Sequence, residues 1–537
     1  MKKRSISKSF LVIAVLAISF VSCKADRTRE DKVAAIIDKV DSPFLVINAV
    51  PGDLIEKSGA LDGALPFTQE MLLSFFIDEE VTGVDYDTDI QIVIGKGPSF
   101  APNFYGIFKL KNEAAFIELL EVEANGEIKE KDGFKYIAKE SDQYVIVWNE
   151  EFVIASNIPI DLAAMMSGGS SNSGMKAVDA SIALISAAED GEVNEDYKTF
   201  LQNESDIALH FSGAGFYEYM VEMSMGEVEE LEANRENIEG VNTDMFLNFN
   251  DGSINMQFLS DLSDKVKEEM GFLKDSQVDS KLLSYGNSSE PIMTMVYNTE
   301  FEKALDYIKE QTPSHEYEEF EEEASEMGIS IEDVKSALTG EILIVIDRVE
   351  IVEEEIDWGY GEPYISKVPT PIFAIVLSVS DESLLTQMLS ASDTVMDGVV
   401  KNGDAYMVMN DNILFSTNDS LWAAKVVENN TVQINDAAGV LSSEPIGVFV
   451  DFLSLAKMDD LDDAAIFVEM LKDARASGDM SEFNFSFTFK DASKNALRIL
   501  TETIANLGNG NGNEEYDALE AELEAAAEST EAVDDSF

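Results

Sequence analysis

The sequence predicts an α+β fold, on three observations. Short segments alternate apolar and polar residues, as in residues 483–487 (FNFSF), and this period is typical of strands with one buried face and one wet face. Segments with helical periodicity and N-cap residues lie between them. Related segments also recur in the same order in the two halves of the chain. We therefore expect two tandem similar domains from an internal duplication, with mixed or antiparallel sheets and helices packed on one side.

The first 22 residues have the layout of a secretion signal. Basic residues precede an apolar run, Phe10–Val21, that is too short to span a membrane, because a spanning helix needs about 20 residues. Phe20 stands three positions before Cys23, and the small residue Ser22 directly precedes it. This arrangement resembles a lipobox. We predict that residues 1–22 are a lipoprotein signal peptide and that lipid on Cys23 holds the chain to a membrane; an incidental cysteine in a buried helix is the alternative.

Cys23 is the only cysteine of the chain. Once it is lipidated, no thiol remains for a disulfide, a thiolate metal site or a cysteine nucleophile. Residues 24–32 are mostly charged, so we interpret residues 23–32 as a lipidated tether. No later apolar run is long enough to span a bilayer, so the lipid is expected to be the only anchor.

The formal net charge is −67, and removing the four basic residues of the signal gives −71. Such a charge repels nucleic acid and anionic lipid, so we expect neither as a partner. The acidity is interpreted as a solvated surface, with specific cation binding as the alternative. Hydrophobic residues make up 45% of the chain, which argues against disorder of its body.

The predicted duplication depends on five pairs of similar segments. They are residues 42–47 with 290–295, 89–94 with 341–346, 106–120 with 374–388, 145–157 with 406–418, and 207–211 with 446–450. Each pair alone is weak, and the shared order is the stronger observation. The pairs predict a first domain over residues 33–280 and a second over 281–507, followed by a flexible acidic tail, 508–537.

Two segments have no counterpart in the other half and are predicted to be loops. They are residues 168–174, which are rich in Gly and Ser, and residues 349–367. The second segment carries Trp358, Tyr360 and Tyr364 between Gly and Pro residues, a composition that suits contact with a partner. The alternative is that these aromatic side chains pack on their own domain.

Helix boundaries are marked by capping residues. Thr68 is expected to cap a helix, and Ser330 with Asp333 forms a capping-box pattern for a helix that Gly340 would end.

Few residues suggest catalysis. The chain has two histidines; His210 aligns with Phe449 of the other half, which predicts a packing role, and His315 lies in an acidic helix and is expected to be exposed. Gly97-Pro98-Ser99 is a poor match to a nucleophile elbow, because Pro102 and another strand follow where a helix is needed. We therefore predict no catalytic residue, no cofactor and no His-based metal site.

The segment Asp85–Asp89 has carboxylates at alternate positions, as a calcium loop does. An EF-hand also needs Gly at its sixth position and Glu at its twelfth, where this chain has Ile90 and Lys96. We predict no metal site of that kind, and a non-standard cation site remains an alternative.

With its lipobox, its length and its duplicated α+β body, the chain resembles the uncharacterised cell-envelope lipoproteins of about 500 residues that are common in Bacteroidetes. The resemblance implies export and lipid anchoring to the outer membrane, and it implies no activity. Lys24-Ala25-Asp26-Arg27 follows the cysteine with mixed charge, which leaves the periplasmic and surface faces both open.

Two classes of function remain. The favoured one is a non-catalytic binding or scaffold lipoprotein of the cell envelope, with a protein or glycan as its partner. The alternative is a carboxylate-based envelope hydrolase acting on glycan or peptide. A pocket with two close carboxyls, one with a raised pKa, beside exposed aromatics such as Trp358 and Tyr360 would favour the hydrolase.

Overall fold

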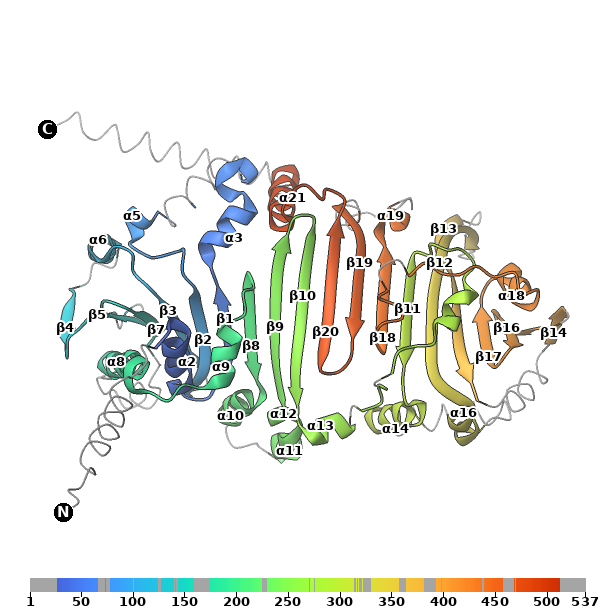
Figure 1. The fold of residues 1–537 in the computed structure, drawn as a ribbon, viewed down its shortest axis with the longest axis horizontal. Helices are drawn as coiled ribbons and strands as arrows, with labels where there is room; N and C mark the ends of the chain where they lie inside the picture. Colours follow the sequence, from blue (N-terminus) through green and yellow to red (C-terminus); the bar gives the residue numbers. More distant parts are fainter. Residues whose placement is uncertain are drawn as a thin grey trace, which may run out of the picture. The chain divides into compact units, whose positions relative to one another are not determined.

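The computed structural model describes residues 27–511 with gaps, the largest of which fall within 66–77, 159–172, 313–329, 357–363, 381–392 and 457–470. The chain divides into two compact units (Figure 1): unit 1 is Met1–Pro51 with Ile77–Ala233, and unit 2 is Gly52–Phe76 with Asn234–Phe537. Both units combine helices with antiparallel strands, so the predicted α+β class is confirmed. In the described part of the chain, no helix has the length and hydropathy of a membrane span.

Unit 1 contains one antiparallel sheet of eight described strands in the order β8-β1-β2-β3-β7-β6-β5-β4. The strands are β1 (Pro43–Ala49), β2 (Ile90–Ser99), β3 (Ala101–Phe108), β4 (Lys129–Lys131), β5 (Phe134–Lys139), β6 (Tyr144–Trp148), β7 (Val153–Asn157) and β8 (Ile207–Ser212). The helices are α2 (Arg29–Lys39), α5 (Glu79–Thr82), α6 (Glu113–Glu123), α8 (Ser173–Asp190), α9 (Glu195–Leu201), α10 (Gly213–Met223) and α11 (Glu229–Ala233).

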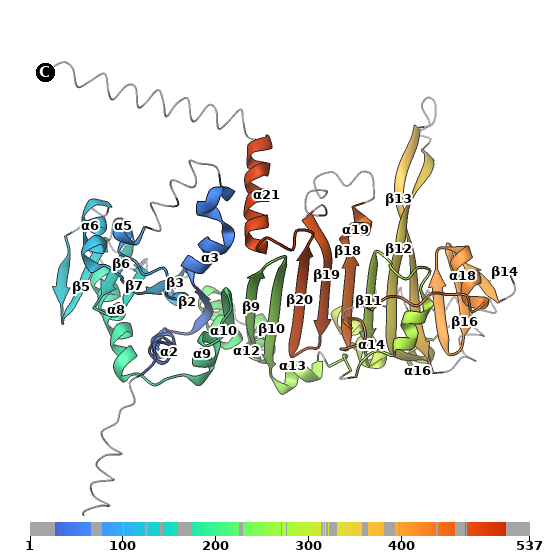
Figure 2. The same ribbon diagram turned by 45° about the horizontal axis from the view of Figure 1, so that its top comes forward.

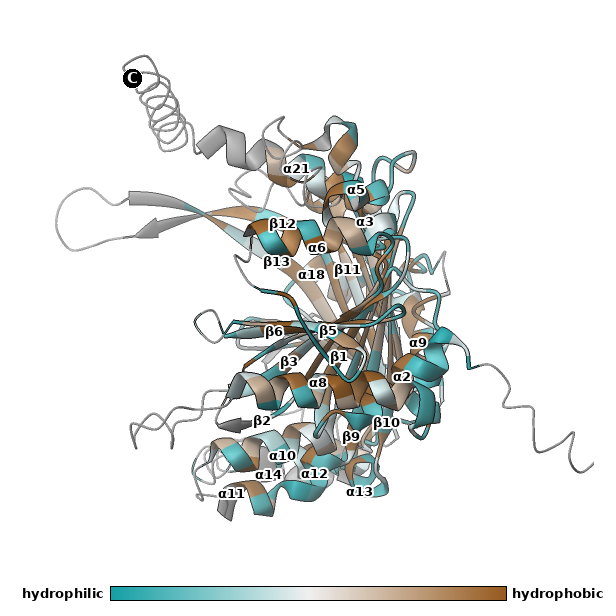
Figure 3. Cartoon of the chain, turned by 90° about the vertical axis from the view of Figure 1, so that its left-hand side faces the viewer, coloured by the Kyte–Doolittle hydropathy of each residue, from teal (hydrophilic) through white to brown (hydrophobic). Residues whose placement is uncertain are grey.

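Helices pack on both faces of the unit 1 sheet, so the prediction of helices on one side was wrong for this unit. Ser156 of β7 contacts Ser181 of α8 through their hydroxyls at 3.3 Å. Val153 of the same strand lies in a cluster with Phe116 of α6. Because side chains alternate along a strand, residues three apart point to opposite faces. Both α2 and α8 carry apolar and polar residues (Figure 3), and the five consecutive residues Val33–Ile37 of α2 are buried.

Unit 2 contains twelve described strands in the order β9-β10-β20-β19-β18-β11-β12-β13-β17-β16-β15-β14, all antiparallel. They are β9 (Val241–Asn250), β10 (Ser253–Leu262), β11 (Met293–Asn298), β12 (Leu338–Ile356), β13 (Tyr364–Val379), β14 (Asp393–Met396), β15 (Val399–Asn402), β16 (Ala405–Asn410), β17 (Ile413–Thr417), β18 (Ile446–Asp451), β19 (Leu471–Gly478) and β20 (Glu482–Phe489).

Unit 2 also contains helices. They are the π-helix η1 (Ala60–Ala64), α12 (Arg235–Glu239), α13 (Asp264–Glu269), the 3-10 helix η2 (Ser280–Tyr285), α14 (Phe301–Gln311), α16 (Ile331–Ala337), α18 (Ser420–Val427), α19 (Phe452–Leu455) and α21 (Ala496–Asn511), with α3 (Pro51–Ser58) at the boundary of the units.

The main core of unit 2 lies on one face of the sheet. Val345 and Phe415 have no exposed surface and pack with Trp422 of α18. The Trp422 ring meets that of Phe415 edge-on at 5.5 Å, and its Nε1 donates a 3.0 Å hydrogen bond to the carbonyl of Tyr285, at the end of η2. The buried indole N–H is therefore satisfied, as a polar group in a core must be.

The same succession of strands occurs in both units. In unit 1 the order β8-β1-β2-β3-β7-β6 corresponds, connection for connection, to β18-β11-β12-β13-β17-β16 in unit 2. Val46 of β1 and Thr294 of β11 are at similar positions. Val46 pairs with Val93 and His210, and Thr294 pairs with Val345 and Phe449. These pairings agree with the sequence offsets of three of the five predicted segment pairs. The pairings of Val145 with Ser156 and of Tyr406 with Thr417 agree with the offset of a fourth.

The remaining segment pair is displaced by one residue. Val93 lies opposite Tyr105, and Val345 lies opposite Ala374. Tyr105, rather than Gly106, therefore occupies the position of Ala374, and the predicted match of residues 106–120 with 374–388 is one residue out of register.

The units do not follow the predicted boundary after residue 280. β9 and β10 belong to unit 2 because β10 pairs along its length with β20, from Ser253 opposite Thr488 to Leu259 opposite Glu482. This contact joins segments more than 200 residues apart, which the local pattern could not reveal. The final helix α21 also extends to Asn511, past the expected end of the second domain at residue 507.

Gly340 does not end a helix, contrary to the prediction. The helix that Ser330 precedes, α16, ends at Ala337, and Gly340 lies inside β12 with φ of +96°. A Cβ at this position would lie 1.7 Å from the carbonyl oxygen of Thr299. The glycine therefore allows two backbone segments to approach closely. The helix predicted to begin at Thr68 lies outside the described residues.

Asp419 fixes the start of α18 and links it to β12. Its carboxylate accepts hydrogen bonds from the backbone N–H groups of Leu421 (2.8 Å) and Trp422 (3.3 Å) and from Nη2 of Arg348 (3.0 Å). Burial alone would raise the pKa of Asp419, but the Arg348 bond and the two backbone bonds outweigh it and hold the pKa below its ordinary value of 3.8.

We predict that Asp419→Ala lowers the free energy of unfolding of unit 2 by about 1–2 kcal/mol, the usual loss for an N-cap. Asp419→Asn, which keeps a capping oxygen, should lose less. Because the folded pKa is lowered, this stabilisation is present above the ordinary aspartate range and is lost as the pH falls through the folded pKa. Urea unfolding at neutral and acidic pH measures both effects. Asp404→Ala, at an exposed position, is the control, and an equal loss there would contradict the capping role.

Candidate functional site

The predicted partner segment, residues 349–367, is not a simple loop. Its first eight residues belong to β12 and its last four to β13, and the two strands pair from Val349 opposite Pro371 to Ile356 opposite Tyr364. Neither strand pairs with another described strand over this stretch, because β11 pairs with β12 only as far as Ile346 and β17 pairs with β13 only from Ala374. The result is a two-stranded ribbon that extends beyond its neighbours (Figure 2).

Among the predicted site residues, Cys23, Trp358 and Tyr360 lie outside the described residues. The backbone of Tyr364 begins β13, at the outer end of the ribbon. The ribbon exposes apolar side chains at its described base, where Ile351 is 45% and Val352 40% exposed.

The predicted calcium-like segment forms ion pairs instead. Asp85 Oδ2 lies 3.5 Å from Nζ of Lys109, and Asp87 Oδ2 lies 3.1 Å from Nζ of Lys111. The carboxylates are therefore paired with the lysines at the end of β3. Among the described residues, no group of three His, Asp or Glu side chains is arranged to hold a metal ion.

The other candidate residues occupy structural positions. His210 of β8 packs against the rings of Tyr197 and Phe200, whose centroids lie 5.2 Å and 5.6 Å away, and His315 is exposed, as expected. Ser99 ends β2, directly before the turn into β3. This is a hairpin rather than the strand, turn and helix of a nucleophile elbow.

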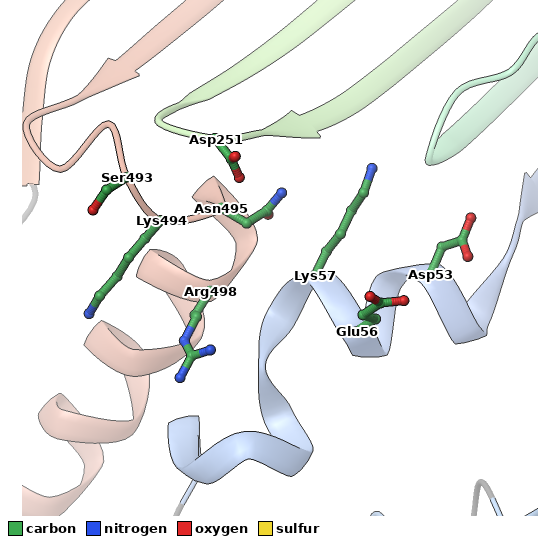
Figure 4. A pocket seen from close by; sticks show the side chains of 8 residues that line it. All are labelled: Asp53, Glu56, Lys57, Asp251, Ser493, Lys494, Asn495 and Arg498. Atoms are coloured by element: carbon green, nitrogen blue, oxygen red, sulfur yellow. The ribbon is translucent and has the colours of Figure 1, made fainter.

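A cavity of about 540 Å³ lies in unit 2 between α3, the β9–β10 turn and the start of α21 (Figure 4). It is lined by Asp53, Glu56, Lys57, Asp251, Ser493, Lys494, Asn495 and Arg498. The three cations are notable in so acidic a chain. However, Lys494 Nζ and Arg498 Nε bind Glu502 at 2.7 Å and 3.0 Å, respectively, so two of them share one carboxylate.

The rest of this cavity is fixed by local contacts. The hydrogen bond from Lys494, supported by that from Arg498, holds the pKa of Glu502 below its ordinary value of 4.5 against the effect of burial. Asn495 caps α21 by accepting from the backbone N–H of Leu497, and its side-chain N–H₂ donates to the carbonyl of Phe249. The polar side chains around this cavity therefore cap α21 and bind it to the sheet.

A second cavity, of about 330 Å³, borders β18 and β19. The buried Asp473 accepts a 2.9 Å hydrogen bond from Nε of Arg475. Asp451, opposite Asp473 in the sheet, accepts from the backbone N–H of Leu453 and the hydroxyl of Ser454. Each carboxylate has its own donors, so this pair does not form the shared-proton arrangement of an acid–base catalyst.

The sheet of unit 2 has a second apolar surface, on the face opposite the core of Trp422. Residues paired across antiparallel strands point to the same face. One row across β9, β10, β20 and β19 contains Leu247, Met256, Phe485 and Ala476. Phe485 also contacts the rings of Phe258 and Phe483, at 5.8 Å and 4.8 Å, on the same face.

The same row continues through β18, β11, β12 and β13, where it contains Val448, Met295, Ile344 and Ile375, and it ends at Ser416 of β17. The four apolar side chains are partly exposed, whereas their neighbours on the core face are buried, except for the partly buried Phe449. We call this surface the apolar face. It comprises the row just described and the row on each side of it, two residues away along every strand. The ribbon drawing shows no helix across the middles of β9, β10, β20 and β19 (Figure 1).

The other side of the same strands is polar. Asn255 of β10 lies opposite Ser486 of β20, whose hydroxyl donates to the Asn255 side chain at 2.8 Å. Gln257 lies opposite Asn484 in the next position on that side. The sheet therefore has a wet face already. The apolar face is covered by a described helix at its β17 end, where Leu414 packs against Ala337 of α16, and no described helix crosses its β9–β19 part (Figure 1).

Sequence reasoning identified the alternation of these strands but assumed that helices would cover the apolar side. The signal that was available is Phe483, Phe485 and Phe487, three aromatic residues at alternate positions of one strand. Nothing in the local pattern indicates that the packed helices of this region lie at the strand ends.

Comparisons with known proteins give little. No protein-family model matches the chain, and no curated protein matches it. Crystal forms IV, I and III of TP0453 are similar to parts of it, at 8%, 10% and 8% identity and TM-scores of 0.25, 0.26 and 0.25. They cover 42%, 45% and 45% of this chain, and 79%, 81% and 87% of their own.

We predict that sodium chloride raises the melting temperature of the protein. Its many carboxylates repel one another, and the screening length falls from about 30 Å at 0.01 M salt to about 8 Å at 0.15 M. Calcium chloride at equal ionic strength should add little, because Asp85 and Asp87 are paired with lysines. Thermal scans in both salts measure this, and a saturable calcium effect at micromolar concentration would restore the cation-site alternative.

Proposed function

We propose that the chain is an exported lipoprotein, anchored to the outer membrane by lipid on Cys23, that binds a partner without catalysing a reaction. The observation that carries the binding function is the apolar face of unit 2, which offers a broad contact surface and has no Asp, Glu, Lys, Arg or His in its three rows. The lipobox supports the anchor. The resemblance to Bacteroidetes envelope lipoproteins supports the location and leaves the leaflet open.

The ribbon of β12 and β13 is a second proposed contact surface, for a protein or glycan. The outer edges of its strands, from Val349 to Ile356 and from Tyr364 to Pro371, pair with no other described strand, and such edges are ready to pair with another chain. Trp358, Tyr360 and Tyr364 belong to this segment of the sequence, and aromatic residues are enriched at interfaces.

The alternative, a carboxylate-based hydrolase, has no specific support. All six described carboxyl groups with a clearly displaced pKa have it lowered: Asp31, Glu113, Asp419, Asp479, Asp491 and Glu502. A general acid needs a raised pKa. Incubation of the purified protein with isolated envelope glycan should therefore release no new reducing ends, and their appearance would contradict the non-catalytic proposal.

We also propose that the two halves arose by internal duplication. The shared strand succession and the common offsets at Val46 and Thr294 support this. Under this proposal the hairpins β9–β10 and β19–β20 are the equivalent last hairpins of the two copies, and they meet through β10 and β20. Aligned relatives should then show similarity between the halves at the same offsets. Halves that match no better than strand composition allows would refute the duplication.

The anchor is tested by Cys23→Ser. We expect this variant to incorporate no radiolabelled palmitate and to accumulate as unprocessed precursor, because the lipobox cysteine is both the acylation site and the first residue after cleavage. Ser22→Ala, which keeps a small residue before the cysteine, is the matched control and should be labelled normally. Palmitate in the Cys23→Ser protein would show that the lipoprotein proposal is wrong.

A further inference from the structure

The apolar face is large enough to need an occupant. Three rows of residues span about 13 Å along each strand, and nine strands span about 38 Å across the sheet, which gives about 500 Å². Patches of this size are the largest that monomeric proteins expose and are often functional. Among the described side chains of the face, Phe373 is 36% exposed and Met256, Phe485 and Val448 are partly exposed.

Charge argues against two of the candidate occupants. A second copy of the chain carries the same net charge of −67, and a membrane rich in anionic lipid carries a negative surface, so both are repelled at moderate ionic strength. The apolar face itself is uncharged. It therefore fits an uncharged apolar body better than either of these surfaces.

Hydrogen bonding argues against a protein partner on this face. A protein interface has about one hydrogen bond per 100–200 Å², so this area would carry about three to five. In its three rows only Tyr297 and Ser416 have polar side chains. An occupant without donors or acceptors leaves no polar group unsatisfied here.

The middle of the face has a strip of small residues. Ala474, Ala476 and Gly478 of β19 lie in register between the phenylalanines of β20 and the aliphatic residues of β18. These are the smallest side chains of the face. Ala476, between Phe485 and Val448, is only 6% exposed, whereas Ala474 is partly exposed. Met256 and Met295 lie further out on the same face, and their unbranched side chains adapt to variable apolar shapes.

From these observations we infer that the apolar face binds the acyl chain of a lipid without net charge, along the strip formed by β19. The inference rests on the proposed binding function and names its ligand class. A linear hydrocarbon requires no hydrogen bonds, is not repelled by the acidic chain and fits a narrow strip between larger side chains.

The test uses the full lipidated protein in phosphatidylcholine vesicles that contain phosphatidylcholine with a photoactivatable diazirine on one acyl chain. After irradiation and digestion, mass spectrometry should locate the label on peptides from β18, β19 and β20. Replacing the vesicle lipid with anionic phosphatidylglycerol should lower the labelling, because the chain is strongly negative.

Two matched variants separate binding in the strip from general stickiness. Ala474→Phe adds an apolar ring that fills the strip, and we expect it to lower labelling of β18–β20 about tenfold, which corresponds to 1.4 kcal/mol. Ser477→Phe adds the same ring on the opposite face of the same strand and should leave labelling unchanged. Simple hydrophobic adsorption predicts the reverse, with Ala474→Phe labelled more strongly.

Several results would overturn the inference. Label confined to peptides near Cys23, with palmitate still on that residue, would remove the acyl site and leave the anchor proposal standing. Cross-linked dimers that Ala474→Phe abolishes would assign the face to a second copy. An unlabelled face that stays resistant to protease would assign it to the chain's own segments. Should Ala474→Phe unfold, the peptide map of the unaltered protein still decides between these outcomes.

Discussion

The structure of unit 2 depends on strand register. Side chains alternate along a strand, so a slip of one residue in any pairing would exchange the buried face and the apolar face. The pairing of β10 with β20 is the most demanding of these contacts, because it aligns Met256 with Phe485 across more than 200 residues of chain. Every row of the sheet from β9 to β17 is continuous only if this register holds, and the cost of closing so long a loop grows only slowly with its length.

The two faces of the sheet differ in how far helices cover them. On one face, η2 and α18 bring Tyr285 and Trp422 onto Phe415, and Asp419 holds the start of α18. On the other face, Val448, Met295 and Ile344 are equally apolar but remain partly exposed. Helices α21 and α13 lie at the strand ends instead, so the same sheet provides a closed core and an open apolar surface.

The sequence predicted what local patterns determine. Alternation identified the strands and the α+β class, and similar segments gave register offsets that the pairings at Val46 and Thr294 share. It could not predict non-local contacts: the β10–β20 pairing that moves the domain boundary, the lysine partners of Asp85 and Asp87, or the close approach of Thr299 that requires Gly340. The ribbon was missed because its strands, such as Glu353–Ile356, have a charged composition that local rules assign to loops.

The acidity of the chain and its open apolar face are physically compatible, because the acidity limits the self-association that the face would otherwise cause. An uncovered face with Phe483, Phe485 and Phe487 would drive self-association in a neutral protein, but a net charge of −67 opposes the approach of a second copy. The repulsion is long-ranged and weakens with salt, whereas contact between the face and an uncharged chain is short-ranged and does not depend on salt. A strongly acidic surface can therefore select against like-charged macromolecules while leaving the face accessible to a small apolar group. Repulsion of like-charged macromolecules is a role for the negative charge that needs no specific cation site. The pairing of Asp85 and Asp87 with lysines is consistent with that role.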